Sequence, residues 1–326
     1  MNDRSPEILE KYDVEVSALR KGRGAMICDT NKGIMLLREY NGTAGRMEYE
    51  EELLGKLGDT GIVCVDKPVR NKENLLITES DEGTKYILKH WFLGNECEAG
   101  NEEYICLGAE VLGRIHKELR GMEFEREIPA EGKPLFEEYS KYNVELKRAR
   151  NFIRGKNKRN QFELDILGCF DEYFFMAEQA VRTLESLCDK AEYDDCLGIT
   201  HGNYNYHNII FLNDNSKCNI ALVNFESSRR QLQILDLYNY LRKVMEKYHW
   251  DEKTGIKLLE SYDRARTISD TEKQFLKALL SYPEKFRKVI NHYYNSKKSF
   301  IPDKNEEKLK QVIAQQTAMT SFMLKI

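Results

Sequence analysis

The chain has 326 residues, of which 41% are hydrophobic and 32% charged, and its 54 acidic and 50 basic residues give a formal net charge of -4. This composition is typical of a globular protein and excludes a disordered or collagen-like chain, and the lack of a basic excess argues against nucleic-acid binding. No apolar run approaches the roughly 20 residues that cross a bilayer, and the first residues lack the plan of a signal peptide, so we expect cytoplasmic synthesis.

The first part of the chain predicts a small sheet with one helix. Short apolar runs separated by turn residues indicate strands over 14–20, 25–30, 33–40, 63–69, 74–80 and 84–92. The turn at residues 30–33 predicts a hairpin. Between these strands, Met47, Leu54 and Leu57 fall on one helical face, and Gly58 is a typical stop signal.

From Glu102 the apolar pattern becomes helical. A stripe with alternating steps of four and three residues consists of Ile105, Ala109, Leu112, His116 and Leu119. The change of pattern predicts two domains, residues 1–93 and 94–326. Residues 141–160 hold eight Lys or Arg side chains, which we interpret as a solvated helix and loop, with an anionic partner as the alternative.

Residues 199–226 are the most organised part of the sequence. A polar loop leads into two apolar runs, 209–212 and 220–225, which flank a turn-rich tetrad at 213–216. This order predicts a β-hairpin that follows a polar loop. Everything after it has a helical pattern, with Pro283 and Pro302 as predicted helix boundaries.

The loop His201–Asn208, followed by a hairpin that ends at Val223–Glu226, carries a family resemblance. It resembles the H-G-D-x-x-x-x-N and I-D-F/W signatures of aminoglycoside and choline kinases. Because the similarity extends over residues 86–96, 145–158 and 234–244, the chain looks most like the CotS-type spore coat proteins within that superfamily. The resemblance implies an α+β, bilobal protein kinase-like fold. It has a small β-rich N-lobe and a larger, mainly helical C-lobe, with a catalytic-loop remnant at 201–226.

Three positions of the kinase signature can be carried over. Asn203 stands where the family has its catalytic Asp, Asn208 at the first metal ligand and Asn224 at the second, where the family has another Asp. An amide cannot accept the substrate proton, and a general base contributes about 10²–10⁴-fold to the rate. A neutral amide at 224 also removes one full negative charge from the shell of Mg²⁺, which is commonly bound through one or two carboxylates plus phosphates. The resemblance therefore implies weak or absent chemistry.

The other residues that the resemblance identifies lie around this loop. By its place in the third strand, Arg38 occupies the position of the phosphate-contacting lysine, with Glu50 or Glu51 as its helix partner; the sequence does not choose between the two. Asp236 is expected to brace the catalytic loop through its backbone, and His201 to order it. Residues 21–24 contain two glycines but no phosphate-loop motif.

Three hypotheses follow for the function. The first is a pseudokinase that acts as a structural or assembly protein of the spore coat, with coat or scaffold proteins as partners and no certain cofactor. The second is a small-molecule O-phosphotransferase that uses ATP and Mg²⁺, with Glu226 or Asp236 recruited to the metal. The third is a nucleotide-binding module that binds ATP without chemistry.

Overall fold

The computed structural model describes residues 5–22, 24–130, 132–213, 218–295 and 302–326. By their internal contacts, the residues form two compact units. The first comprises Met1–Ala130, Gly198–Tyr240 and Ser261–Arg266, and the second comprises Glu131–Leu197, Leu241–Glu260 and Thr267–Ile326. The sequence predicted a different division, into kinase-like lobes at residues 1–93 and 94–326. The two compact units do not test that division, which stays a prediction.

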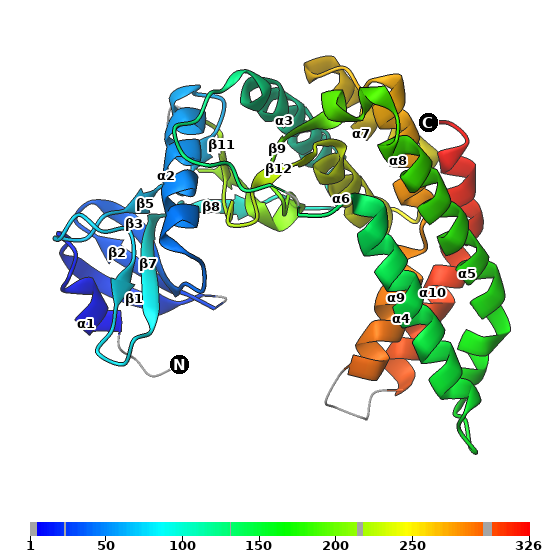
Figure 1. Ribbon diagram of the computed structural model, residues 1–326. Coiled ribbons are helices and arrows are strands. Elements are labelled where there is room, and N and C mark those ends of the chain that lie inside the picture. The colour runs from blue at the N-terminus through cyan, green and yellow to red at the C-terminus, as the bar shows by residue number, and fades with distance from the viewer. Residues whose placement is uncertain (1–4, 23, 131, 214–217, 296–301) are drawn as a thin grey trace. The chain divides into compact units, whose positions relative to one another are not determined.

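The first unit begins with an antiparallel sheet (Figure 1). Its strands run in the order β1 (Val16–Lys21), β2 (Met26–Thr30), β3 (Gly33–Glu39), β7 (Lys85–His90) and β5 (Pro68–Val69), and β6 (Thr78–Glu79) also pairs with β7. Thr30 pairs with Gly33, which confirms the predicted hairpin. Arg23, in the predicted glycine-containing loop, lies outside the described residues.

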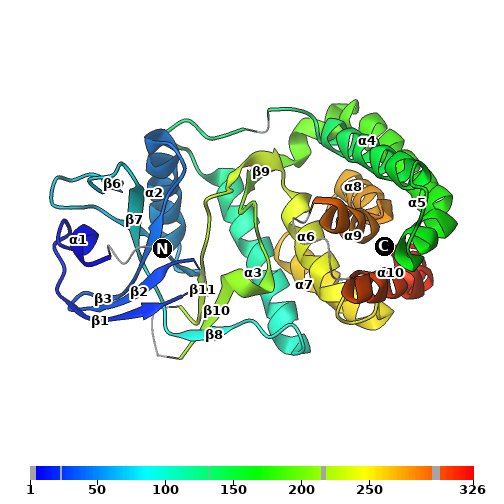
Figure 2. The same ribbon diagram turned by 90° about the horizontal axis from the view of Figure 1, so that it is seen from below.

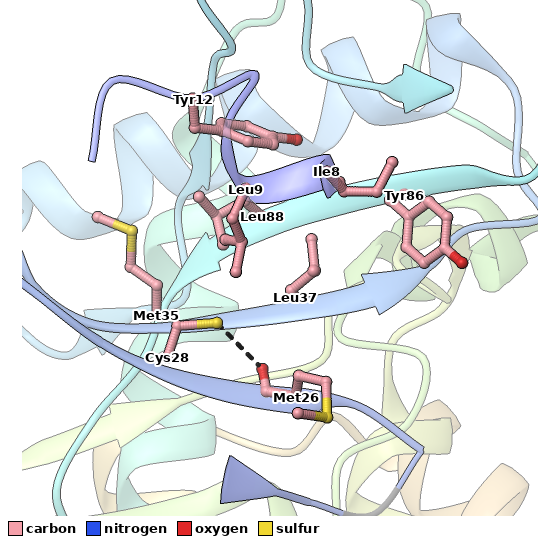
Figure 3. Close-up of a cluster of buried hydrophobic side chains, with 9 residues drawn as sticks. All are labelled: Ile8, Leu9, Tyr12, Met26, Cys28, Met35, Leu37, Tyr86 and Leu88. Atoms are coloured by element: carbon pink, nitrogen blue, oxygen red, sulfur yellow. Dashed lines mark hydrogen bonds between the residues drawn. The ribbon is translucent and has the colours of Figure 1, made fainter. Parts of the chain in front are cut away.

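One face of this sheet is apolar. Successive side chains of a strand point to opposite faces, so Met35 and Leu37 of β3 share a face. They pack with side chains of β2, of β7 and of the segment that contains helix α1 (Ser5–Leu9) (Figure 3). The members of this cluster are Ile8, Leu9, Tyr12, Met26, Cys28, Met35, Leu37, Tyr86 and Leu88.

The opposite face carries two basic side chains. Arg38 pairs across the strands with Ile87, and Leu36 pairs with Lys89. Cross-strand partners lie on the same face, and so do residues two apart on one strand, so Arg38 and Lys89 are neighbours there.

Helix α2 (Ala44–Asp59) covers this second face, since its Met47 packs against Ile87 and Tyr40. The helix begins after Thr43, whose Oγ1 accepts a hydrogen bond from the Arg46 N–H at 3.3 Å, as an N-cap residue does. Helix α2 confirms the helix predicted from Met47, Leu54 and Leu57, and it extends beyond these residues in both directions.

The first unit also holds a second sheet, in the order β4 (Cys64–Val65), β11 (Ile220–Leu222), β10 (Ile209–Leu212) and β8 (Gly94–Glu96). Strands β10 and β11 form the predicted hairpin, whose turn residues 214–216 lie outside the described residues. Helix α3 (Glu102–Gly121) runs beside this sheet (Figure 2). Tyr104 stacks on Phe211 of β10, with ring centroids 4.1 Å apart. All five residues of the predicted helical stripe are buried, which confirms it.

One short pair of strands was missed. Strand β12 (Arg229–Leu232) pairs with β9 (Leu197–Thr200), so the prediction that only helices follow residue 226 is wrong at this point. Only Gln231 and Leu232 are buried on β12, so the strand has no apolar alternation that would reveal it in the sequence.

The remaining regular elements of the described chain are helical. They are α4 (Leu135–Arg154), α5 (Gln161–Cys188), α6 (Ile234–Met245), α7 (Glu252–Ala265), α8 (Asp270–Ser281), α9 (Glu284–Asn295) and α10 (Pro302–Met323), with 3₁₀ turns at Ala191–Cys196 and Tyr206–Asn208. Pro283 separates α8 from α9, which confirms that predicted boundary, and the described part of α10 starts at Pro302, next to residues that the structure does not describe. Within the second unit, Tyr173 of α5 stacks on Phe286 of α9 at 4.4 Å. Of the helices described, none is long and apolar enough to cross a membrane.

Candidate functional site

The predicted catalytic loop, residues 201–208, follows β9 in the first unit. Asp236 forms hydrogen bonds with the first two residues of this loop. The Asp236 carboxylate accepts hydrogen bonds from the backbone N–H groups of His201, at 2.6 Å, and Gly202, at 3.0 Å. The same carboxylate contacts the buried His116 ring at 3.2 Å. These are the contacts that a bracing role requires, and the role itself stays a prediction.

His201 is a fully buried, neutral imidazole. Its Nδ1 faces the Asn203 N–H at 3.2 Å, and its Nε2 faces the Val223 carbonyl oxygen at 3.1 Å. The first partner can only donate and the second can only accept, so Nε2 carries the proton. Burial lowers the pKa of His201 to about 4, although the charge of Asp236 acts in the opposite direction. The ring thus ties the loop to the end of the hairpin without carrying charge.

Gly202 allows the loop to pass close to the segment after the hairpin. Its φ of +78° is in the left-handed region that favours glycine, and an added Cβ would overlap the backbone carbonyl of Ser227. A side chain at this position would therefore separate the loop from residues 225–228.

The three asparagines at the kinase positions form one directed chain of hydrogen bonds. Arg38 Nη1 donates to Asn224 Oδ1 at 3.3 Å, and Asn224 Nδ2 donates to Asn208 Oδ1 at 2.8 Å. Asn208 Nδ2 in turn donates to the backbone carbonyl of Asn203 at 2.9 Å. A guanidinium can only donate and a backbone carbonyl can only accept, so the two ends of the chain fix the orientation of both amides.

This arrangement does not fit a magnesium ion. Both side-chain oxygens that would face the metal, those of Asn208 and Asn224, already accept a hydrogen bond. The Asn224 amide also points N–H groups at the Asn208 oxygen, where a cation needs lone pairs and preferably charge. Among the residues that the structure describes, no group of three His, Cys, Asp or Glu side chains could hold a metal ion.

The backbone at Asn224 is also set for this role. Its φ of +69° is left-handed, a conformation that asparagine tolerates better than most residues. Its N–H donates to Asp66 Oδ2 at 3.1 Å. Residues 224–226 lie beyond the end of β11, so Asn224 and Glu226 are not neighbouring positions on one face of a strand.

Beside the asparagines, a buried lysine gathers three carboxylates. Lys89 Nζ lies 2.6 Å from Glu50 Oε1, 2.7 Å from Asp66 Oδ2 and 3.3 Å from Glu226 Oε1. The side chains of Lys89 and Asp66 are completely buried, and that of Glu50 is 1% exposed. Burial raises the pKa of the Asp66 carboxyl, although the nearby Lys89 partly offsets this.

The expected partnership of Arg38 with a helix glutamate is replaced by other pairs. Arg38 forms an ion pair with Glu226, while Glu50 pairs with Lys89. Glu51 binds Arg70 through both of its carboxylate oxygens at a more exposed position. The reason is geometric, because Lys89 of the neighbouring strand shares the sheet face with Arg38 and lies against the Glu50 carboxylate.

The sequence interpretation found the loop but missed two residues of the cluster. Lys89 and Asp66 lie in runs that were predicted as strands, and the resemblance offered Arg38 of β3 as the partner of Glu50, whereas the structure pairs Glu50 with Lys89 of the neighbouring strand β7. A charged residue inside the apolar run 86–92 was the available signal, since lysine is almost never buried without a partner. A cavity of about 710 Å³ lies elsewhere, against Ala44, Leu76 and Thr78, and none of the predicted site residues lines it.

The family model for the spore coat putative kinase YutH matches residues 5–326. The chain belongs to this spore coat kinase-like family. The predicted resemblance to CotS-type spore coat proteins is therefore confirmed at the level of the family. No curated protein matches the chain.

Solved structures support the fold of this spore coat kinase-like protein. An aminoglycoside phosphotransferase from Alicyclobacillus acidocaldarius aligns with a TM-score of 0.79 at 16% identity, over 99% of this chain and 97% of its own. A spectinomycin phosphotransferase in complex with ADP and spectinomycin has a TM-score of 0.62 at 12% identity, over 96% of each chain. An amicoumacin kinase in complex with AMP-PNP and Ca²⁺ has the same TM-score at 13% identity, over 98% of this chain and 94% of its own. These similarities confirm the predicted α+β, kinase-like fold.

Proposed function

We propose that the protein is a non-catalytic member of the kinase-like fold that acts as a structural or assembly component of the spore coat. The observation that carries this proposal is the hydrogen-bond chain from Arg38 through Asn224 and Asn208 to Asn203. It engages the side chains of Asn208 and Asn224, which stand at the metal-binding positions, and the Asn203 side chain at the base position is a neutral amide as well. Membership of the spore coat family supports the location in the coat and coat proteins as partners.

A phosphotransferase with recruited acids has less support. Glu226 is engaged by Arg38 and Lys89, and Asp236 by two loop N–H groups. To hold a metal, either carboxylate would have to give up these contacts and reach within about 2.1 Å of an octahedral ion. Both are better accounted for as internal partners of the fold.

The catalytic half of the proposal is tested by a turnover assay. The purified protein is incubated with γ-labelled ATP, Mg²⁺ or Mn²⁺, and a panel of small hydroxylated and amino compounds. We expect no transfer above background, because neither a general base nor a charged metal ligand is present. The double variant Asn203→Ala/Asn224→Ala is the matched control, since label transfer by a contaminating kinase is the same in both preparations. Transfer by the wild type that the double variant abolishes would contradict the proposal.

The location is tested separately by fractionating spores of the producing cell and probing the extracted coat with an antibody. We expect the protein in the coat fraction. Its presence only in the spore core would remove the structural role.

A further inference from the structure

Helices α4 and α5 of the second unit lie side by side and run in opposite directions (Figure 2). Two ion pairs set their alignment. Arg150 Nη1 lies 2.8 Å from Asp171 Oδ1, and Lys147 Nζ lies 3.4 Å from Glu178 Oε1. Higher-numbered residues of α4 therefore lie beside lower-numbered residues of α5.

Both helices bury one side within the second unit. Tyr139 of α4 contacts Tyr282 with ring centroids 4.6 Å apart, and Tyr173 of α5 stacks on Phe286 at 4.4 Å. The opposite sides of the two neighbouring helices face away from this packing. They form one continuous surface, which we call the outer surface of the hairpin.

The outer surface carries large apolar side chains. Val144 and Phe152 of α4 are 47% and 57% exposed, and Leu164 and Phe175 of α5 are 48% and 61% exposed. Helical residues three or four positions apart are neighbours, so each helix contributes one stripe. Gly168 leaves a gap in the stripe of α5, because an added Cβ there would meet nothing within 4 Å. A contiguous apolar patch of this kind marks a site of protein–protein contact.

The two stripes carry charges of opposite sign. Arg148 lies on the stripe of α4, four residues from each of its apolar members, and Glu172 lies on the stripe of α5 between Gly168 and Phe175. Both side chains are exposed, and neither has an ion-pair partner among the described residues. Arg148 belongs to the basic stretch 141–160, for which an anionic partner is the alternative interpretation of the sequence.

This pattern is complementary to itself. A two-fold axis that runs between the two helices, parallel to them, places α4 of one copy against α5 of a second copy at the same level. The alignment within the hairpin then brings Arg148 within one helical turn of Glu172 of the second copy. Phe152 of the first copy lies over the gap at Gly168 of the second. Each contact occurs twice, as in any isologous interface.

The charges at the open end of the hairpin are mixed. Arg182 of α5 comes level there with Glu137 and Lys141 of α4, one acid and one base. This end therefore neither favours nor opposes the pairing strongly, and the Arg148–Glu172 contacts decide the electrostatic complementarity.

We propose that the outer surface of α4 and α5 is an isologous interface between two copies of this chain, in which Arg148 pairs with Glu172 of the second copy beside an apolar core of Val144, Phe152 and Phe175. The inference goes beyond the proposed function, because it assigns a partner to a surface that shares no residue with the asparagine network. It uses residues of the second unit alone.

Sedimentation equilibrium of the full chain measures the dissociation constant of the dimer. We expect the wild type to dimerise below about 100 μM, and Arg148→Glu or Glu172→Arg to raise Kd at least about tenfold, because like charges then meet twice. The double variant Arg148→Glu/Glu172→Arg restores opposite charges, so its Kd is expected within about threefold of the wild type. Lys308→Glu is the matched control, because it reverses one exposed charge on α10.

Phe175→Ser tests the apolar contacts, and we expect it to raise Kd at least about tenfold as well. All of these side chains are exposed, so circular dichroism should show the wild-type helix content in each variant.

The proposal is overturned if the wild type remains monomeric at about 100 μM, or if Arg148→Glu changes Kd no more than Lys308→Glu does. A double variant that binds no tighter than the single variants, or an unchanged Kd for Phe175→Ser, overturns it too. These outcomes are separate from those of the turnover assay. An active wild type that dimerises contradicts the proposed function alone, and an inactive monomer contradicts this inference alone.

Discussion

His201 stabilises the loop only while its ring is neutral. Its two nitrogens have partners of opposite kind, and a proton added to Nδ1 would face the Asn203 N–H. The hydrogen bonds of His201 therefore stabilise the loop to an extent that depends on pH. Both ring nitrogens are engaged within the chain, so this arrangement gives the ring no part in proton transfer to a substrate.

The pH dependence of stability follows from the depressed pKa of His201. Its folded pKa of about 4 lies below the unfolded value of 6.5, so between these values the unfolded chain binds more protons. Stability is therefore present above about pH 6.5 and is lost as the pH falls toward 4. We expect His201 to contribute up to about 3 kcal/mol to this loss, at about 1.4 kcal/mol for each pH unit.

The measurement is urea unfolding, followed by circular dichroism from pH 7.5 to 4.5. The variant His201→Gln is expected to have a flatter profile than the wild type, whatever its stability at neutral pH. Parallel profiles for His201→Gln and the wild type would show that the ring is not held neutral.

At the scale of elements, the Lys89 cluster connects strand β7, helix α2 and the segment after β4. One ammonium group faces Glu50 and Asp66, and all three side chains are almost completely shielded from water. Buried ion pairs of this kind are weak evidence for stability, but breaking one leaves an uncompensated charge in the interior. The cluster therefore matters chiefly as a constraint on how α2 lies on the sheet.

Replacing the lysine by an apolar residue of similar length tests this constraint. We expect Lys89→Met to lower the free energy of unfolding by about 3–5 kcal/mol, because two buried carboxylates then face each other without a cation. Lys85→Met on the same strand should change it by no more than about 0.5 kcal/mol, since Lys85 is 45% exposed. Chemical denaturation at pH 7 measures both, and a loss below about 1 kcal/mol for Lys89→Met would mean that the carboxylates are not held charged around it.

Elements with a local signal were predictable from the sequence. The turn at residues 30–33, the apolar face around Met47 and the stripe from Ile105 to Leu119 each follow from spacing within one segment. Strand β12 was not predictable, because its pairing with β9 depends on residues about 30 positions away. The choice of Glu50 over Glu51 was equally open, since adjacent helix residues point in different directions and only the position of Lys89 distinguishes them.

At the scale of the whole molecule, the chain has the family fold, and amides stand at the positions where the resemblance places catalytic acids. His201 and Gly202 of the loop, and Asp236 of α6, contact one another and the neighbouring backbone through hydrogen bonds and close packing that involve no metal. The side-chain amides at the two positions that would carry chemistry have partners inside the chain: Asn203 Oδ1 accepts from Asn205, and Asn224 donates to Asn208. The motif comparison identifies the amides at 203 and 224, but only the three-dimensional arrangement reveals that Arg38 contacts Asn224 and is itself paired with Glu226.

The central claim is that the hydrogen bonds among Arg38, Asn224 and Asn208 prevent the site from binding a metal ion with a nucleotide. The most direct test is whether the wild type binds a metal–nucleotide complex. Enhancement of water proton relaxation by Mn²⁺ and ADP reports such a ternary complex directly. We predict no enhancement beyond that of Mn²⁺ and ADP alone at millimolar concentrations, because both amide oxygens are engaged within the chain. An enhancement in the wild type that is lost in Asn208→Ala would show that the asparagines do bind a metal, and would contradict the non-catalytic interpretation of the site.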